Sequence, residues 1–192
     1  PPGKGDITNM IRSYIVRCQK AGVTIKMNQE VTLDLIREEK PDSVIVASGS
    51  RTLILPIEGI DNPAIIHGSD LLDGKRAAGK KVLVVGGGMV GCETAAFLGE
   101  QNHDVTVIEF RDTVGADVIH EHRVYLMKDF EDYKIKEITG AKVCKFYEDG
   151  VEYETADGQR HESRGYDSVI LSMGFRNYNP CLLYTSDAAD EL

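Results

Sequence analysis

The sequence lacks several residue types and patterns that mark particular classes of protein. Its 192 residues include no tryptophan and only four cysteines, and no two cysteines have C-x-x-C spacing. This spacing argues against a redox-active dithiol or a zinc ribbon within the chain. No apolar run approaches the ~20 residues that a membrane-spanning helix needs. A formal net charge of −9 argues against a general nucleic-acid or anionic-membrane surface.

The composition otherwise suits a globular protein, which we expect to be cytoplasmic. Hydrophobic residues make up 42% of the chain and charged residues 28%. No nucleophile–base pair or carboxylate–histidine cluster is evident, so we predict no metal site and name no catalytic side chain. The chain opens on Pro1 without a methionine, and we expect its natural start to lie upstream.

A glycine-rich segment, VVGGGMVGCE at 84–93, is the most informative part of the sequence. Residues 82–85 are apolar without polar alternation, as expected of a strand buried on both faces of a parallel sheet. Gly86, Gly88 and Gly91 follow with G-x-G-x-x-G spacing. In that motif the glycines permit a tight turn, the approach of a pyrophosphate and close packing of the next helix.

A helix is predicted over 88–101, ended by Asn102 in a left-handed cap. Its start would direct backbone amides and the positive end of its dipole at the phosphates, through Gly87, Gly88, Met89 and Val90. A second strand at 105–108 ends in Glu109, 23 residues after Gly86, where a carboxylate binds the adenine ribose. We therefore interpret residues 80–109 as a dinucleotide site, the alternative being a βαβ turn with no ligand.

Glu109 favours NADH over NADPH, because a carboxylate accepts hydrogen bonds from ribose hydroxyls and repels a 2′-phosphate. Arg111 is the competing signal, since an arginine at this place can reach a 2′-phosphate. After this unit, residues 118–132 have a helical pattern. Asp-Gly pairs at 149–150 and 157–158 predict hairpins that form an antiparallel flap on the parallel sheet.

The chain before the glycines predicts a different set of elements. Residues 6–20 have the pattern of an amphipathic helix, capped by Asp6 or Thr8. Residues 23–32 alternate between apolar and polar side chains, which predicts a strand. Residues 36–40 are predicted to be a short charged connector, and residues 44–47 a buried strand.

Two segments resemble flavoprotein pyridine-nucleotide reductases. SVIVASGSRTLILPIEGID resembles their segment ending in A-T-G-x-x-P, with Ser48 in place of Thr, and YDSVILSMGFRNYNP at 166–180 resembles its second occurrence. In that superfamily an NAD(P)H domain is inserted between two halves of an FAD domain. The resemblance implies an α/β fold with a Rossmann-like NAD(P)-binding domain at 77–175, inserted into a partial FAD-binding domain at 1–76 that resumes at 176–180.

The segments PPGKGDI and GGGMVGCETAAFL resemble the reductase part of the enoate reductase and 2,4-dienoyl-CoA reductase family, relatives of old yellow enzyme. In such enzymes NAD(P)H reduces FAD, and electrons pass through an iron–sulfur cluster to FMN on an N-terminal barrel, which reduces a small-molecule substrate. The barrel, the cluster cysteines and the first FAD glycine motif are not in this sequence. From the net charge and the absence of a long apolar run, we expect no nucleic-acid or membrane partner.

The resemblance also suggests roles for individual residues. Glu93 would lie near the nicotinamide, or would simply be a carboxylate in the first turn of the helix, and Gly174 would keep the returning chain close to the nicotinamide. On the FAD side it suggests Val31, Ala47, Ser48 and Gly49. Residues 181–192 resemble translated sequencing adapter and are expected to be non-native, the alternative being a genuine helix.

Two other functions are compatible with these motifs. One is another NADH-dependent flavin reductase, of the NADH oxidase or ferredoxin reductase type. The other is a module that senses NADH without transferring hydride.

Overall fold

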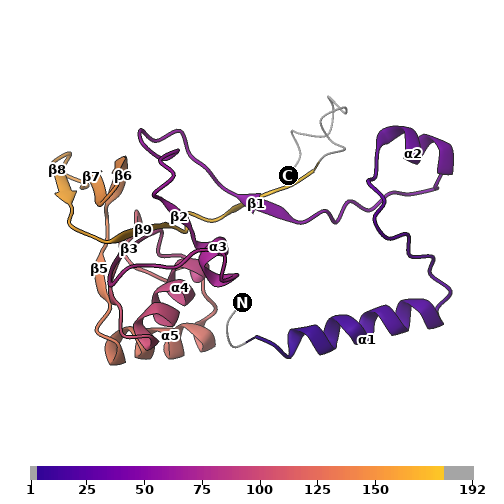
Figure 1. Ribbon diagram of the computed structural model, residues 1–192, viewed down its shortest axis with the longest axis horizontal. Helices are drawn as coiled ribbons and strands as arrows, with labels where there is room; N and C mark the ends of the chain where they lie inside the picture. The colour runs from indigo at the N-terminus through magenta and orange to yellow at the C-terminus, as the bar shows by residue number, and fades with distance from the viewer. Residues whose placement is uncertain (1–3, 180–192) are drawn as a thin grey trace. The chain divides into compact units, whose positions relative to one another are not determined.

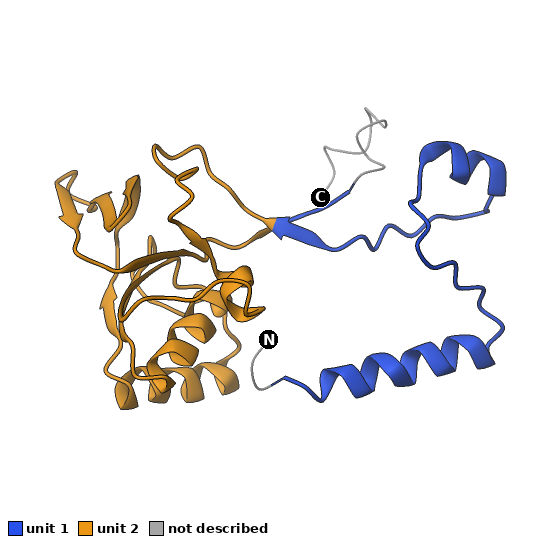
Figure 2. Ribbon diagram, viewed as in Figure 1, with its two compact units in different colours: residues 1–51, 176–192 blue, residues 52–175 orange. Residues whose placement is uncertain are grey.

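The computed structural model describes residues 4–179, so the predicted non-native tail at 181–192 lies outside the described residues. The chain divides into two compact units, which Figure 2 colours separately. Unit 2 is Thr52–Phe175. Unit 1 comprises the flanking residues, of which 4–51 and 176–179 are described.

Unit 2 is built on a five-stranded parallel sheet (Figure 1). The strand order is β2 (Ile66–His67), β9 (Ser168–Leu171), β3 (Lys81–Val85), β4 (Asp104–Ile108) and β5 (Lys136–Ile138). In the central strand β3, Val82 pairs with Val105 on one side and Ser168 on the other. Residues 82–85 are buried, which confirms both the predicted strand and the predicted α/β class.

Helices cover one face of this sheet. α4 (Met89–Glu100) follows the glycine loop, and Asn102 beyond its end has the left-handed φ of 63° that was predicted. α5 (His120–Asp132) begins two residues later than predicted, and α3 (Gly68–Leu72) is a single short turn. One apolar cluster joins these helices to the sheet, and it includes Val84, Ala95, Leu98, Leu126 and Phe130.

The predicted antiparallel flap covers the opposite face. β6 (Lys142–Tyr147), β7 (Gly150–Glu154) and β8 (Arg160–Ser163) pair in sequence order, with both Asp-Gly pairs at the turns. A second apolar cluster joins Phe146 and Val151 of the flap to Leu83 and Leu171 of the parallel sheet. Unit 2 therefore has three layers, with a core on each side of the parallel sheet.

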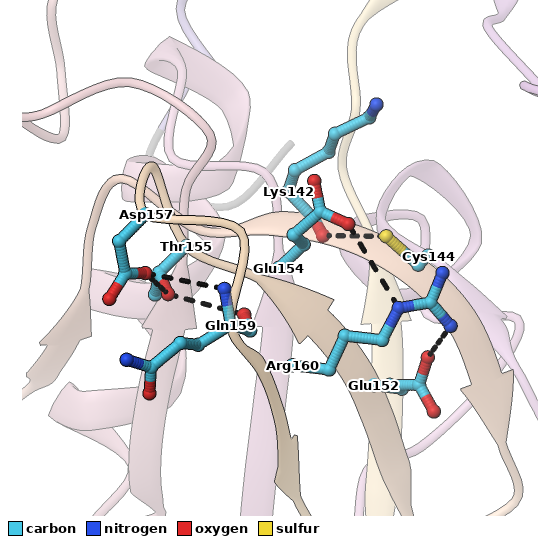
Figure 3. Close-up of polar contacts among 8 residues, drawn as sticks. All are labelled: Lys142, Cys144, Glu152, Glu154, Thr155, Asp157, Gln159 and Arg160. Carbon is cyan, nitrogen blue, oxygen red and sulfur yellow. Dashed lines mark hydrogen bonds and ion pairs between the residues drawn. The ribbon is translucent and has the colours of Figure 1, made fainter.

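Figure 3 shows how side chains shape the second hairpin of the flap. The Asp157 carboxylate accepts hydrogen bonds from the Thr155 hydroxyl at 2.6 Å and the Gln159 amide at 3.3 Å, and these bonds lower the pKa of Asp157. Beyond the turn, Arg160 pairs across the strands with Glu152 at 2.8 Å. The polar contacts close the turn, whereas the exposed ion pair adds little to stability.

Unit 1 has regular elements but no buried residue in its described part. α1 (Ile7–Lys20) confirms the predicted helix, although the Asp6 side chain makes no capping hydrogen bond and the apolar stripe of α1 is exposed. β1 (Ser50–Thr52) and β10 (Phe175–Asn177) pair with each other. None of the helices in residues 4–179 is long and apolar enough to cross a membrane.

Three predictions for unit 1 were wrong. Residues 23–32 and 44–47 form no strand, because an apolar pattern becomes a strand only where another strand accepts its hydrogen bonds. Residues 36–39 are not a connector but the end of α2 (Leu33–Glu39). The Thr32 hydroxyl caps α2 by accepting a hydrogen bond from the Leu35 amide at 3.2 Å, and Lys40 ends it in a left-handed conformation.

Candidate functional site

The candidate site lies where the carboxyl ends of β9, β3 and β4 meet. The glycine loop leaves β3 between its two neighbours, which is the position where open α/β sheets bind ligands. Gly86 has φ +104°, and a side chain there would overlap the Ser172 carbonyl at the end of β9. The first glycine of the motif is therefore required both by its conformation and by the close approach of β9.

The other two glycines set the start of α4. Gly88 is the N-cap, with a φ of −72° that other residues can adopt, and it presents no side chain to the space beyond the helix end. Gly91 lies inside the first turn, and a Cβ there would overlap the Gly86 carbonyl oxygen. Helix and loop thus pack as the motif predicts, and the first amides of α4, which have no partner within the helix, can bind an anionic group.

Glu109 turns back from the end of β4 onto the glycine loop. Its Oε2 accepts a hydrogen bond from the Gly87 amide at 2.5 Å, and its Oε1 accepts one from the Arg111 amide at 3.0 Å. These two bonds fix the carboxylate beside the loop that would hold the pyrophosphate. A carboxylate keeps unused acceptor capacity in this arrangement, which ribose hydroxyls can use.

These residues surround a cleft of about 360 Å³, within the usual size range of a small-molecule site. Its lining comprises Gly86, Gly88, Met89, Val90, Glu109, Arg111, Asp117, Ser172, Met173, Gly174 and Phe175. Seven residues predicted from the sequence are thus brought together, and Gly87 and Gly91 lie buried behind them. Gly174, which lines the cleft, has φ +101°, and its carbonyl accepts a hydrogen bond from the Leu53 amide.

Four lining residues were missed from the sequence, namely Asp117, Ser172, Met173 and Phe175, and the first two of these have polar side chains. The Asp117 carboxylate accepts a hydrogen bond from the Met89 amide at the start of α4. The amide nitrogen is 3.1 Å from Oδ1 and 3.3 Å from Oδ2. Ser172 is 8% exposed, and its hydroxyl has no hydrogen-bond partner among the described residues. Asp117 lies in an irregular loop, where spacing carries no signal. Ser172 had one available signal, since it directly follows the buried strand β9.

The prediction that Glu93 lies in the first turn of the helix was wrong. α4 begins at Met89 and has no acidic residue in its first turn, so Glu93 lies one turn further along. Its carboxylate is 3.8 Å from Nε2 of His122 on α5. Because the dipole effect falls off within the first turn, Glu93 contributes little to it. A position near the nicotinamide stays a prediction, since Glu93 does not line the cleft.

Cys92 contributes packing to the site. The thiol is fully buried, donates to the Gly87 carbonyl oxygen at 3.2 Å, and joins the helix-side core. Burial, followed by the negative charge of Asp117, raises its pKa to about 12. A thiol that stays protonated at neutral pH is a poor nucleophile.

The residues predicted for FAD lie in unit 1, and all four are exposed. Ser48 donates to the Tyr178 carbonyl, and the Tyr178 amide donates to the Gly49 carbonyl at 2.9 Å. Gly49 has φ +80°. The structure therefore brings Ser48 and Gly49 to the returning chain but does not enclose them. The FAD-binding roles of Val31, Ala47, Ser48 and Gly49 stay predictions.

Strand, glycine loop, helix and terminal glutamate define unit 2 as an α/β module of the dinucleotide-binding class. Residues 3–189 match the family described as pyridine nucleotide-disulphide oxidoreductase, and the chain belongs to that family. Its homologues are flavin-dependent NAD(P)H oxidoreductases, and the family binds FAD and NADH.

Individual relatives agree with the reductase type indicated by the sequence. The chain is 32% identical to bilirubin reductase of Mediterraneibacter gnavus over 92% of its length and 30% identical to cinnamate reductase of Clostridium sporogenes over 91%. A solved 2-naphthoyl-CoA reductase complex has a TM-score of 0.78 and 30% identity over 93% of the chain. The chain spans only 26–27% of the length of these three proteins. The findings support a reductase of the enoate and dienoyl-CoA reductase type.

Proposed function

We propose that unit 2 binds NADH and presents it for hydride transfer to FAD. The observation that carries this proposal is the position of Glu109, whose carboxylate is hydrogen-bonded to the glycine loop at the edge of the cleft. A phosphate-binding loop and a ribose-binding carboxylate then lie side by side, as a dinucleotide requires. The proposal includes the predicted organisation in which residues 77–175 are an insert in an FAD-binding domain.

Each group in the cleft has a distinct task under this proposal. The amides at Gly88 and Met89 hold the pyrophosphate at the helix start, and Glu109 accepts hydrogen bonds from the adenine ribose. Gly174, which has no side chain, allows the nicotinamide to lie close to the backbone at the opposite side of the loop. Bound NADH supplies a hydride, and the protein positions it and excludes water.

The rest of the proposed electron path lies in parts of the protein beyond this chain. FAD would be completed by further segments, because the four exposed residues of unit 1 do not enclose it. The electrons would pass through an iron–sulfur cluster to FMN on a barrel. The three relatives are named for bilirubin, cinnamate and 2-naphthoyl-CoA, all conjugated molecules, which supports a small-molecule substrate with a conjugated double bond. We place the protein in the cytoplasm.

Titration of the 192-residue chain with NADH and NADPH tests the proposal. We expect NADH to bind roughly 10- to 150-fold more tightly than NADPH, the range that a charge-assisted hydrogen bond provides. The nicotinamide fluorescence of the two cofactors is the measurement. Equal or tighter binding of NADPH would indicate that Arg111, which also lines the cleft, decides the selectivity instead of Glu109.

The variant Gly88→Val tests whether the glycine loop is the site. Its φ of −72° permits a side chain, so the fold should survive while the added atoms occupy the pyrophosphate space. We expect NADH binding to be lost. Gly5→Val is the matched control, because a Cβ at Gly5 has no neighbour within 4 Å. A folded Gly88→Val protein with unchanged NADH affinity would show that the loop is not the binding site.

A further inference from the structure

We propose that Asp117 is a built-in competitor for the pyrophosphate of NADH, and that the cofactor must displace its carboxylate to bind. This inference rests on the proposed function, since it concerns the affinity of the same cleft. Under this proposal Asp117 lowers the affinity for NADH, because its carboxylate lies at the start of α4.

The first observation is the contact between Asp117 and the helix. Both carboxylate oxygens lie within hydrogen-bond distance of the Met89 amide, at 3.1 and 3.3 Å. Oδ2 is also 3.1 Å from where a Cβ of Gly88 would be, so the carboxylate fills the space that this glycine leaves open. Gly88 and Met89 supply the amides that a pyrophosphate uses in this motif. A carboxylate and a phosphate are both anionic acceptors, so both cannot hold the same amide.

A second, independent observation points to a ligand in the same cleft. Ser172 belongs to the lining and is 8% exposed, and its hydroxyl, which lies toward Gly68, has no hydrogen-bond partner among the described residues. Buried hydroxyls are normally hydrogen-bonded, so this wall of the cleft is suited to a polar ligand.

The position of Asp117 allows it to leave. The residue is exposed and lies in the irregular loop between β4 and α5. Gly115, two residues before it, has φ +65°. The Arg123 guanidinium donates a hydrogen bond to the Thr113 hydroxyl in the same loop at 2.9 Å. The loop is thus anchored upstream of Asp117, and a change in the aspartate side chain alone frees the Met89 amide.

The test compares Asp117→Ala with Asp112→Ala in the full chain. Asp112 lies in the same loop and carries the same charge but does not line the cleft. Affinities for NADH and for ADP-ribose, which lacks the nicotinamide, are measured by calorimetry, and the melting temperature is measured without ligand. We expect Asp117→Ala to bind both ligands roughly 2- to 30-fold more tightly, the range of an N-cap contribution.

The same variant should melt at a lower temperature without ligand, because α4 loses its cap. A gain in affinity together with a loss of stability is a signature that a merely structural role does not give. Asp112→Ala should leave both quantities unchanged. If Asp117→Ala is poorly folded, Asp117→Asn retains an acceptor, removes the charge, and should show a smaller gain.

Three outcomes separate this inference from the proposed function. Equal gains for NADH and ADP-ribose support displacement by the pyrophosphate. Unchanged or weaker NADH binding in a folded Asp117→Ala protein overturns the inference while the proposed function stands. If neither the unmodified chain nor any variant binds either ligand, the proposed function itself fails.

Discussion

Two apolar runs of similar composition have opposite fates in this chain. The run KVLVV at 81–85 forms β3, and Leu83 within it is fully buried. The run SVIVA at 43–47 forms no strand, and Ile45 is 91% exposed. β3 pairs with strands on both sides and has a layer on each face. An apolar run therefore becomes a strand only when other segments supply hydrogen bonds along its edges and cover its faces.

The same difference separates the two units. Unit 2 contains both apolar clusters, whereas no described residue of unit 1 is buried. Burial of apolar surface is the main favourable term in folding. We infer that unit 2 provides the folding stability of the described chain.

The largest expected effect is the result of cutting the chain at the boundary. Residues 52–175 alone should unfold cooperatively on heating and should bind NADH as tightly as the whole chain, because both cores and the cleft lie within them. Residues 1–51 alone should show no cooperative transition. Circular dichroism during heating, with NADH titration, checks both statements. A cooperative transition in residues 1–51 would refute the comparison.

The sequence predicted elements well where their partners are close in the chain. β3, α4 and β4 form one consecutive unit, and the hairpins of the flap are local pairs. Their hydrophobic patterns and turn residues are therefore sufficient to predict these elements from the sequence. The strands predicted at 23–32 and 44–47 failed because strand formation depends on segments distant in sequence, which a local pattern does not report.

The candidate site was predictable to the same extent. Spacing located the glycine loop and Glu109, since a motif fixes both. It did not locate Asp117 or Ser172, because an irregular loop and the end of β9 reach the cleft only through the tertiary fold. Glu93 was assigned to the wrong helical turn. An error of one residue in the predicted start of a helix does not change the fold. It does decide whether a carboxylate lies in the first turn, where it would interact with the helix dipole.

A smaller effect is expected from single substitutions in the two apolar runs. Leu83→Ala should lower the free energy of unfolding by about 2–5 kcal/mol, because it removes buried atoms between the parallel sheet and the flap. Ile45→Ala should change it by no more than about 0.5 kcal/mol, since the side chain is exposed. Urea denaturation provides both values. A similar loss in both variants would mean that residues 43–47 are packed in solution.

The smallest expected effect concerns two cysteines, one in each unit. Cys92 in unit 2 is buried, whereas Cys18 in unit 1 is half-buried. Burial raises the pKa of Cys92 from 9.0 to about 12 in the folded protein. The unfolded chain therefore releases this proton first as the pH rises. The stability linked to the protonated thiol is complete below pH 9 and is lost progressively between pH 9 and about 12.

Between pH 8 and pH 10 the unmodified protein should therefore lose about 1 kcal/mol more stability than Cys92→Ala, which has no thiol to ionise. The comparison of slopes removes the contributions of lysine and tyrosine, which both proteins share. Cys18→Ala should keep the slope of the unmodified protein. Urea denaturation at the two pH values gives the slopes. Parallel slopes for the unmodified protein and Cys92→Ala would show that this thiol ionises as readily in the folded chain as in the unfolded one, and the core around α4 would then be open to water.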